Sequence, residues 1–245
     1  MKKYELLKTD SIQHCGVTLY RIKALIDFSD VKAGQVGGYV ENERNLSQEG
    51  KAWVYGEARV SRNACVSGNA RVYDSAHVYG ETRVSGDAEV YGDARVYDSA
   101  QVYWNARVYG SAQVYWNACV YGNACVYDDA WVYGNACIYG NACIYDDARV
   151  YGKVRVYDDA WVYGEARISG NADIKNETDY ILFKNNWSSG RFFTYTKSNK
   201  MWRVGCFHGT GDELVKKAYE DSQLSGDHYK LYVELVKKME EIENG

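Results

Sequence analysis

The sequence predicts a mainly β protein: a single-stranded parallel β-helix of short repeats with an N-terminal cap and a small C-terminal α+β domain. Three observations lead to this fold class. A six-residue phrase repeats without interruption through residues 52–174, the chain contains 24 Tyr and no Pro, and the phrase stops after Asn176. The absence of Pro suits a chain that is mostly strand ladder, because Pro lacks the backbone donor that a ladder needs.

The repeated phrase is A-x-[VI]-Y-[GD]-[ND] in one-letter code. Ala recurs at every sixth position from Ala52 to Ala172, which makes 21 hexads, and only Thr82 and Val154 depart from it. Val or Ile follows two residues later in every hexad. Because side chains alternate along a strand, Ala and Val face one side while x and Tyr face the other. Gly, Asn or Asp then turns the chain, since these residues tolerate positive φ.

Each strand of this pattern has its apolar side chains on the same side of the path, which excludes an ordinary array of hairpins. The economical arrangement is a solenoid with Ala and Val inside and three short strands in each coil. A coil then takes three hexads, so the 21 hexads predict seven coils. The coils stack at the usual strand spacing of about 4.8 Å.

The spacing [VI]-x-x-x-A-x resembles the hexapeptide repeat of left-handed parallel β-helices, and the left-handed coil is implied by this resemblance. The segment LIDFSDVKAGQVGGYVENERNLSQEGKAWVYGEA, residues 25–58, is similar to the entry segment of bacterial and prophage hexapeptide-repeat proteins. Some members of this family are named as acetyltransferases. The repeats also resemble those of polymer-forming proteins. The resemblance covers residues 1 to about 175. It is specific for the fold and is poor evidence for chemistry.

The two ends of the chain differ in composition from the repeats. Residues 1–46 are predicted to form a hairpin and a capping coil, because an open coil end exposes unpaired backbone. Residues 47–176 form the predicted β-helix, and residues 177–245 form an α+β domain that covers its other end. In that domain DYILFK, RFFTYT and MWRVGC are typical of strands. GTGDELVKKAYED predicts a helix with a capping box at Thr210 and Glu213, and HYKLYVELVKKMEEI predicts a second helix.

Composition and charge argue against several classes of protein. The chain has 29 Lys+Arg and 33 Asp+Glu, a net charge of −4, and no dominant cationic stretch. We therefore expect no nucleic-acid partner held by phosphate contacts. No run approaches the roughly 18 apolar residues of a membrane span, and the start MKKYELLKTD lacks the apolar region of a signal peptide. The seven Cys are then predicted to be reduced thiols in a cytoplasmic protein.

Tyrosines at the fourth position of the phrase stack at intervals of three hexads on three outer faces. Face one carries Tyr55, Tyr73, Tyr91, Tyr109, Tyr127, Tyr145 and Tyr163; face two carries Tyr79, Tyr97, Tyr115, Tyr133 and Tyr151; face three carries Tyr103, Tyr121, Tyr139 and Tyr157. These ladders can serve as binding surfaces. They can also act as stabilisers only, since stacked rings bury their faces and neighbouring Arg adds cation–π contact.

Two turns carry a Trp where most hexads have Gly or Asp. Trp104 and Trp116 stand there, at opposite edges of face three. Clustered exposed apolar area usually marks an interface, so the predicted binding residues are these two with Tyr103, Tyr121 and Tyr139. Drift of the repeat, or packing of each indole on its tyrosine neighbours, is the alternative.

No metal or cofactor is predicted. Two cysteine pairs stack on the outer faces, Cys119 with Cys137 and Cys125 with Cys143. A metal site requires three or four ligands, usually including His, so these cysteines are interpreted as small side chains that only fill space on the faces. The aspartates at 128, 129, 146 and 147 share one corner and could hold Ca²⁺, but turn chemistry explains them equally well.

The predicted function is non-catalytic binding or scaffolding through the solenoid faces and the C-terminal domain. We expect a homo-oligomer, a dimer or trimer, with a protein partner possible, and a prophage setting implied by the resemblance would allow a role on host factors. In the C-terminal domain, Trp187, Trp202 and Phe207 are either contact residues or core.

The alternative is an acyl-CoA-dependent acyltransferase, for which the resemblance implies a His as general base. The repeat region has one His, His77, with Tyr79 and Arg95 as neighbours on face two. His is the usual base near neutral pH. However, no insertion interrupts the coils to build an acceptor pocket, which favours binding over catalysis.

Overall fold

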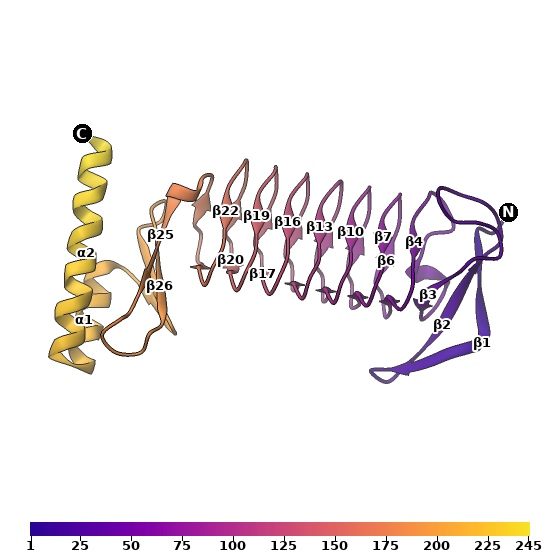
Figure 1. Ribbon diagram of the computed structural model, residues 1–245, viewed down its shortest axis with the longest axis horizontal. Coiled ribbons are helices and arrows are strands. Elements are labelled where there is room, and N and C mark those ends of the chain that lie inside the picture. Colours follow the sequence, from indigo (N-terminus) through magenta and orange to yellow (C-terminus); the bar gives the residue numbers. More distant parts are fainter.

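The structure is a computed structural model that describes residues 1–245 apart from the side chain of Asn244. A parallel β-solenoid forms the long body of the molecule, a hairpin lies at its N-terminal end, and two helices on a small sheet lie at the other end (Figure 1). The predicted fold class, a parallel β-solenoid with an N-terminal cap and a C-terminal α+β region, is confirmed.

Three parallel sheets form the faces of the solenoid, and strands paired across a sheet are three hexads apart through the repeats. Face one consists of β4 (Trp53–Val54), β7 (Arg71–Val72), β10 (Glu89–Val90), β13 (Arg107–Val108), β16 (Cys125–Val126), β19 (Cys143–Ile144) and β22 (Trp161–Val162). Face two consists of β3 (Val36–Val40), β5 (Arg59–Val60), β8 (His77–Val78), β11 (Arg95–Val96), β14 (Gln113–Val114), β17 (Trp131–Gly134), β20 (Arg149–Gly152) and β23 (Arg167–Ile168). Face three consists of β6 (Cys65–Val66), β9 (Arg83–Val84), β12 (Gln101–Val102), β15 (Cys119–Val120), β18 (Cys137–Ile138), β21 (Arg155–Val156) and β24 (Asp173–Ile174).

The solenoid contains one coil more than the seven predicted, because residues 36–51 also wind around the axis. In this first coil Val40 pairs with Val60 and Leu46 bridges to Val66, so both pairs are further apart in the chain than three hexads. Val40 and Leu46 keep the six-residue spacing, but eight residues separate Leu46 from Val54. A short 3₁₀ turn, η1 (Glu43–Asn45), lies in this coil. The two extra residues remove the three-hexad period there, so this coil lies outside the 21 regular hexads and overlaps the capping coil predicted within residues 1–46.

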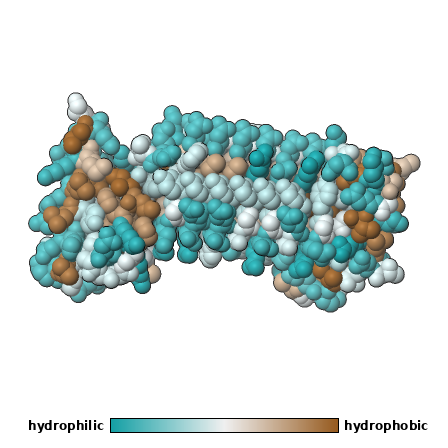
Figure 2. Space-filling view, in the orientation of Figure 1, coloured by the Kyte–Doolittle hydropathy of each residue, from teal (hydrophilic) through white to brown (hydrophobic). Residues whose placement is uncertain are grey.

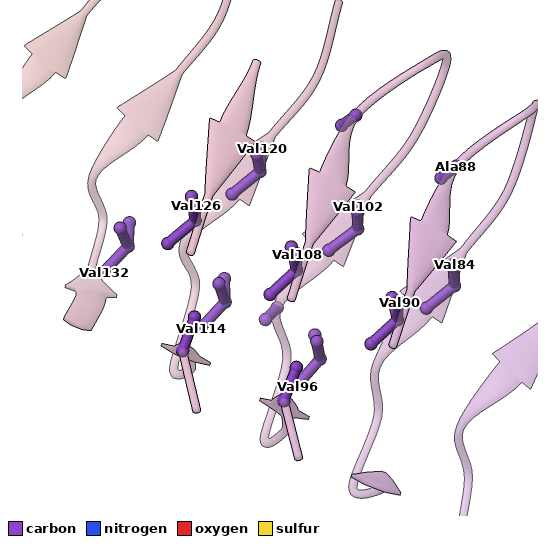
Figure 3. Close-up of a cluster of buried hydrophobic side chains, with 14 of the residues drawn as sticks. Val84, Ala88, Val90, Val96, Val102, Val108, Val114, Val120, Val126 and Val132 are labelled. Atoms are coloured by element: carbon purple, nitrogen blue, oxygen red, sulfur yellow. The ribbon is translucent and has the colours of Figure 1, made fainter. Parts of the chain in front are cut away.

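The interior is a column of small aliphatic side chains. The Ala and Val or Ile positions of the hexads are fully buried, and Figure 3 shows valines of successive coils pointing into the same interior. Thr82, which replaces Ala, is also fully buried, and its hydroxyl donates to the Tyr79 carbonyl at 2.8 Å. Because its one donor is satisfied, the polar residue is tolerated inside the column.

An antiparallel hairpin precedes the first coil. It consists of β1 (Tyr4–His14) and β2 (Val17–Ala24), and β2 continues the sheet of face two by pairing with β3. Cys15 and Gly16 form its turn with φ of 47° and 80°. The hairpin begins at the N-terminal end and slants back below the first coils (Figure 1). Its tip contacts face two, as the His14–His77 ring contact shows.

The C-terminal region is a four-stranded antiparallel sheet with two helices. The strands are β25 (Tyr180–Lys184), β26 (Phe192–Thr196), β27 (Met201–Val204) and β28 (Phe207–Gly209), after a 3₁₀ turn, η2 (Glu177–Asp179). Helix α1 (Gly211–Asp221) begins at the predicted capping box, with Thr210 N donating to Glu213 at 2.8 Å. Helix α2 (Gln223–Asn244) begins five residues before the segment predicted to form it. Apolar residues gather at both ends of the molecule, and the face of the solenoid in Figure 2 is mostly hydrophilic.

Candidate functional site

Tyrosine ladders run along all three faces, as the repeat predicts. In each ladder, rings of successive coils lie 4.7–5.3 Å apart between centroids and within 1–15° of parallel. Tyr55 departs from this geometry, since its ring meets Tyr73 edge-on at 87°. Partial burial, with the Tyr79 phenol as a further contribution, raises the pKa of Tyr97 to about 12. Such phenols stay neutral near pH 7, so the ladders are neutral apolar surfaces rather than rows of bases.

The five predicted binding residues divide between two ladders. Tyr103, Tyr121 and Tyr139 stack on face three, and Trp104 lies edge-on to Tyr103 and Tyr121 at 5.6 and 5.7 Å. Trp116 instead lies edge-on to face-two tyrosines 115 and 133, at 5.5 and 5.7 Å. Both indoles occupy left-handed turn positions, with φ of 61° and 58°, and both are exposed, at 60% and 53%. Each indole is therefore supported by a ladder and still open to solvent.

The cysteine pairs lie where the repeat places them. Cys119 pairs in register with Cys137, and Cys125 with Cys143, and all four are free and half-buried. The adjacent Cys119 thiol, and then the charge of Arg155, lower the pKa of Cys137. Within the described part of the chain, no group of three or more His, Cys, Asp or Glu side chains could hold a metal ion.

The aspartate corner is built as a turn. Asp128 and Asp146 adopt φ of 55° and 57°, and the Asp146 carboxylate accepts a hydrogen bond from the Gly164 amide at 3.0 Å. Asp tolerates this left-handed backbone because its short side chain can bond nearby amides. Turn geometry therefore accounts for these carboxylates without a bound ion.

A pocket that sequence reasoning missed lies between the hairpin tip and face two. The hairpin places the His14 ring 4.8 Å from the His77 ring, edge to face at 79°. The Cys15 sulfur lies 3.5 Å from Nε2 of His14. The two histidines are far apart in the chain, and no periodic signal connects the hairpin with β8. A turn-forming Cys-Gly pair directly after a His was the sequence feature that could have drawn attention to this tip.

Arg59 holds both imidazoles in one state. Its Nη1 lies 3.2 Å from Nδ1 of His14 and 3.3 Å from Nε2 of His77. A guanidinium can only donate, so each of these ring nitrogens is an acceptor and each ring carries its proton on the other nitrogen. Burial, and then the charge of Arg59, lower the pKa of His77 to about 4 and also lower the pKa of His14. Both rings are thus neutral near pH 7.

The cavity at this place is cationic. It has a volume of about 260 Å³, and its charged lining residues are Arg59, Arg62 and Arg95. No Asp or Glu lines it, and among the described residues none of the three arginines has a carboxylate within ion-pair distance. The Nε of Arg59 is buried and has no hydrogen-bond partner in the described structure. The pocket therefore brings together three positive charges that have no carboxylate partner.

The aromatic residues of the C-terminal region belong to its own core. Trp202 is 2% exposed, and Trp187 and Phe207 pack against the same cluster of buried residues. Trp187 also stacks on His228 at 4.4 Å. Of the two roles left open for these side chains, the structure shows the core role.

Neither helix in the described part of the chain combines the length and the apolar character that a membrane span requires.

Comparison with known proteins points to one kind of solenoid protein. Residues 64–80, 88–103, 100–115, 142–158 and 148–164 match the YdcK beta solenoid repeat. A 73-residue stretch is 37% identical to the "Uncharacterized acetyltransferase YdcK" of Escherichia coli (strain K12), and the match covers 27% of this chain and 22% of that protein. The chain thus aligns with less than a quarter of the length of this relative. The predicted resemblance to a β-solenoid family that includes a protein named as an acetyltransferase is confirmed.

Proposed function

We propose that this chain is a non-catalytic binding protein that uses its solenoid as a rigid scaffold. The observation that carries the proposal is the pair of exposed indoles, Trp104 and Trp116, at turn positions that Gly or Asp occupies in most other hexads, with Arg62 as an exception. The left-handed backbone of these turns disfavours a large aromatic side chain, so a Trp at each of two turns points to a role outside the turn. Aromatic side chains that are held rigidly and remain exposed are typical of interface anchors.

The proposed occupant of this surface is a second copy of the chain. The ladders repeat at 4.8–5.2 Å over Tyr103, Tyr121, Tyr139 and Tyr157 and over the face-two tyrosines. A second copy has the same period, so a contact made at one coil can recur at the next. Repeated small contacts of this kind add up along a solenoid, and closed homo-oligomers are the commonest assemblies of soluble proteins.

The test is the molar mass in solution of the wild type and of variants at the two turns. Trp104→Gly and Trp116→Gly restore the residue type of the other hexads, so the fold should be retained. We expect the wild type to scatter light as a multiple of its 27.8 kDa chain mass and the double variant as a single chain. Trp161→Ala, which removes an indole of similar exposure, 48%, on face one, should not change the mass. A monomeric wild type, or an unchanged double variant, would contradict the proposal.

The second candidate is an acyl-CoA-dependent acyltransferase with His77 as general base. The name of the relative and the meeting of His77 with His14 in a cavity favour it. Against it, the acceptor nitrogen of His77 is occupied by Arg59, so taking a proton from a substrate requires that bond to break. Mass spectrometry after incubation with acetyl-CoA and an amine acceptor decides between the two: a mass gain on the acceptor that His77→Ala abolishes would establish the enzyme.

A further inference from the structure

We propose that the pocket between the hairpin tip and face two binds the phosphoryl group of a small phosphate ester. Three arginines converge on a cavity that no carboxylate lines. Like charges at this density repel one another unless an anion lies between them. Guanidinium groups recognise phosphate through paired N–H donors, so the lining has the chemistry that a phosphoryl group requires.

The second observation is the fixed position of Arg59. Both Nη1 hydrogens are used by the two imidazoles, at 3.2 and 3.3 Å, and this orients the guanidinium plane. Its Nε–H is buried and unpaired in the described structure, out of reach of the cavity. Because the guanidinium is already oriented, it would lose little freedom on binding an anion.

The size and the remaining lining limit the ligand. A cavity of about 260 Å³ is slightly below the usual range for drug-sized ligands, which begins at roughly 300 Å³. It suits a phosphoryl group with a body of a few carbons. Val17 and the Tyr79 ring supply the apolar part of the wall, and Ser61 supplies a hydroxyl.

The hairpin completes this site. His14, Cys15 and Val17 come from the hairpin, whereas the arginines come from the coils. A ligand that contacts both parts holds the hairpin against the solenoid. We therefore expect binding to slow amide hydrogen exchange in β1 and β2 near the turn, since exchange there requires the hairpin to open.

The test titrates the full-length protein with inorganic phosphate, glycerol 3-phosphate and succinate, followed by NMR of the backbone amides. We expect saturable shifts at residues 14–17, 59–62, 77–79 and 95 with both phosphates, and tighter binding of the ester. Arg95→Ala should weaken binding about tenfold or more, as expected for loss of one charge-assisted contact. The control is Arg83→Ala, an exposed arginine at the equivalent position on face three, which should bind as the wild type does.

Three results would overturn the proposal. The first is the absence of saturable shifts with either phosphate. The second is an equal loss of affinity in Arg83→Ala and Arg95→Ala, because this would indicate unspecific attraction to positive charge. The third is equal or tighter binding of succinate, because the site would then recognise carboxylates rather than phosphoryl groups.

Discussion

At the scale of single residues, Arg59 determines the state of two histidines. One guanidinium nitrogen donates to both rings, and burial adds to the effect of its charge. The contact depends on a hairpin that docks far along the chain and brings His14 to Arg59 and His77. The sequence could place His77 on face two, because the repeat is periodic. It could not place His14 there, because the hairpin lies outside the repeats and no periodic pattern indicates where it docks.

The first prediction is the pH dependence that follows from His77. Its pKa of about 4 in the folded protein lies below the value of about 6.5 for an unfolded chain. The unfolded state therefore binds more protons between these values, and the folded protein should lose stability as the pH falls from 6.5 towards 4. Urea unfolding at pH 7 and pH 5 measures this loss, which should be smaller in His77→Gln. NMR of the wild-type imidazole should show a neutral His77 at pH 5, and a ring that titrates near pH 6.5 would contradict the prediction.

At the scale of elements, side-chain ladders reinforce the turns as the backbone ladders reinforce the strands. Asn105, Asn123, Asn141 and Asp159 form a chain of hydrogen bonds across successive coils, at 3.0, 3.0 and 2.9 Å. From the sequence, Asn and Asp at these positions were interpreted as turn-forming residues. The bonds between coils were not predicted, because they depend on which turns carry an amide in adjacent coils, and the hexads vary there.

The second prediction concerns this amide ladder. Asn123→Ala removes two exposed hydrogen bonds and should lower the free energy of unfolding by about 1 kcal/mol. Asn63→Ala is the matched control, because Asn63 stands at the same turn position before an Ala and its side chain makes no hydrogen bond with the described residues. Denaturant titrations of the two variants measure the difference. Equal stability of Asn123→Ala and Asn63→Ala would show that the ladder contributes nothing.

At the scale of the whole molecule, both open ends of the solenoid are closed by side chains. At the N-terminal end, the Lys3 amine donates to the Ala52 carbonyl at 2.9 Å. At the other end, amides of the last coil donate to hydroxyls of the C-terminal region: Tyr163 to Tyr180, Arg167 to Thr194 at 3.0 Å and Asp173 to Ser198 at 2.8 Å. The hydroxyls at the C-terminal end satisfy edge donors without adding a strand on which another chain could build, whereas at the N-terminal end β2 also extends the sheet of face two.

The third prediction concerns this C-terminal closure. Thr194→Val with Ser198→Ala removes the acceptors for the amides of Arg167 and Asp173. Hydrogen exchange at these two amides should accelerate while exchange in the central coils stays unchanged, because each coil contacts only its neighbours. Ser111→Ala, at a turn on the middle of the solenoid, serves as control. Unchanged exchange at both amides in the double variant would show that the hydroxyls do not close the end.

The general plan of the molecule could be predicted because short local patterns encode it: six residues specify a strand and a turn, and three such units specify a coil. The first coil was predicted only as a capping coil within residues 1–46, because two residues added between Leu46 and Val54 interrupt the regular period. The pocket escaped prediction because it joins a coil to a cap. Long-range docking of this kind depends on surface fit, which the spacing of residues along the chain does not report.

The three-hexad register also determines which genetic changes the protein can accept. Duplication or loss of three hexads lengthens or shortens the body by one strand spacing, about 4.8 Å, and leaves each later residue on its face. Duplication of a single hexad would instead turn everything that follows by one third of a revolution. The alanine column would survive, since every hexad supplies the same interior residues. The C-terminal region would then project from a different face of the solenoid, so it would lose its former contacts.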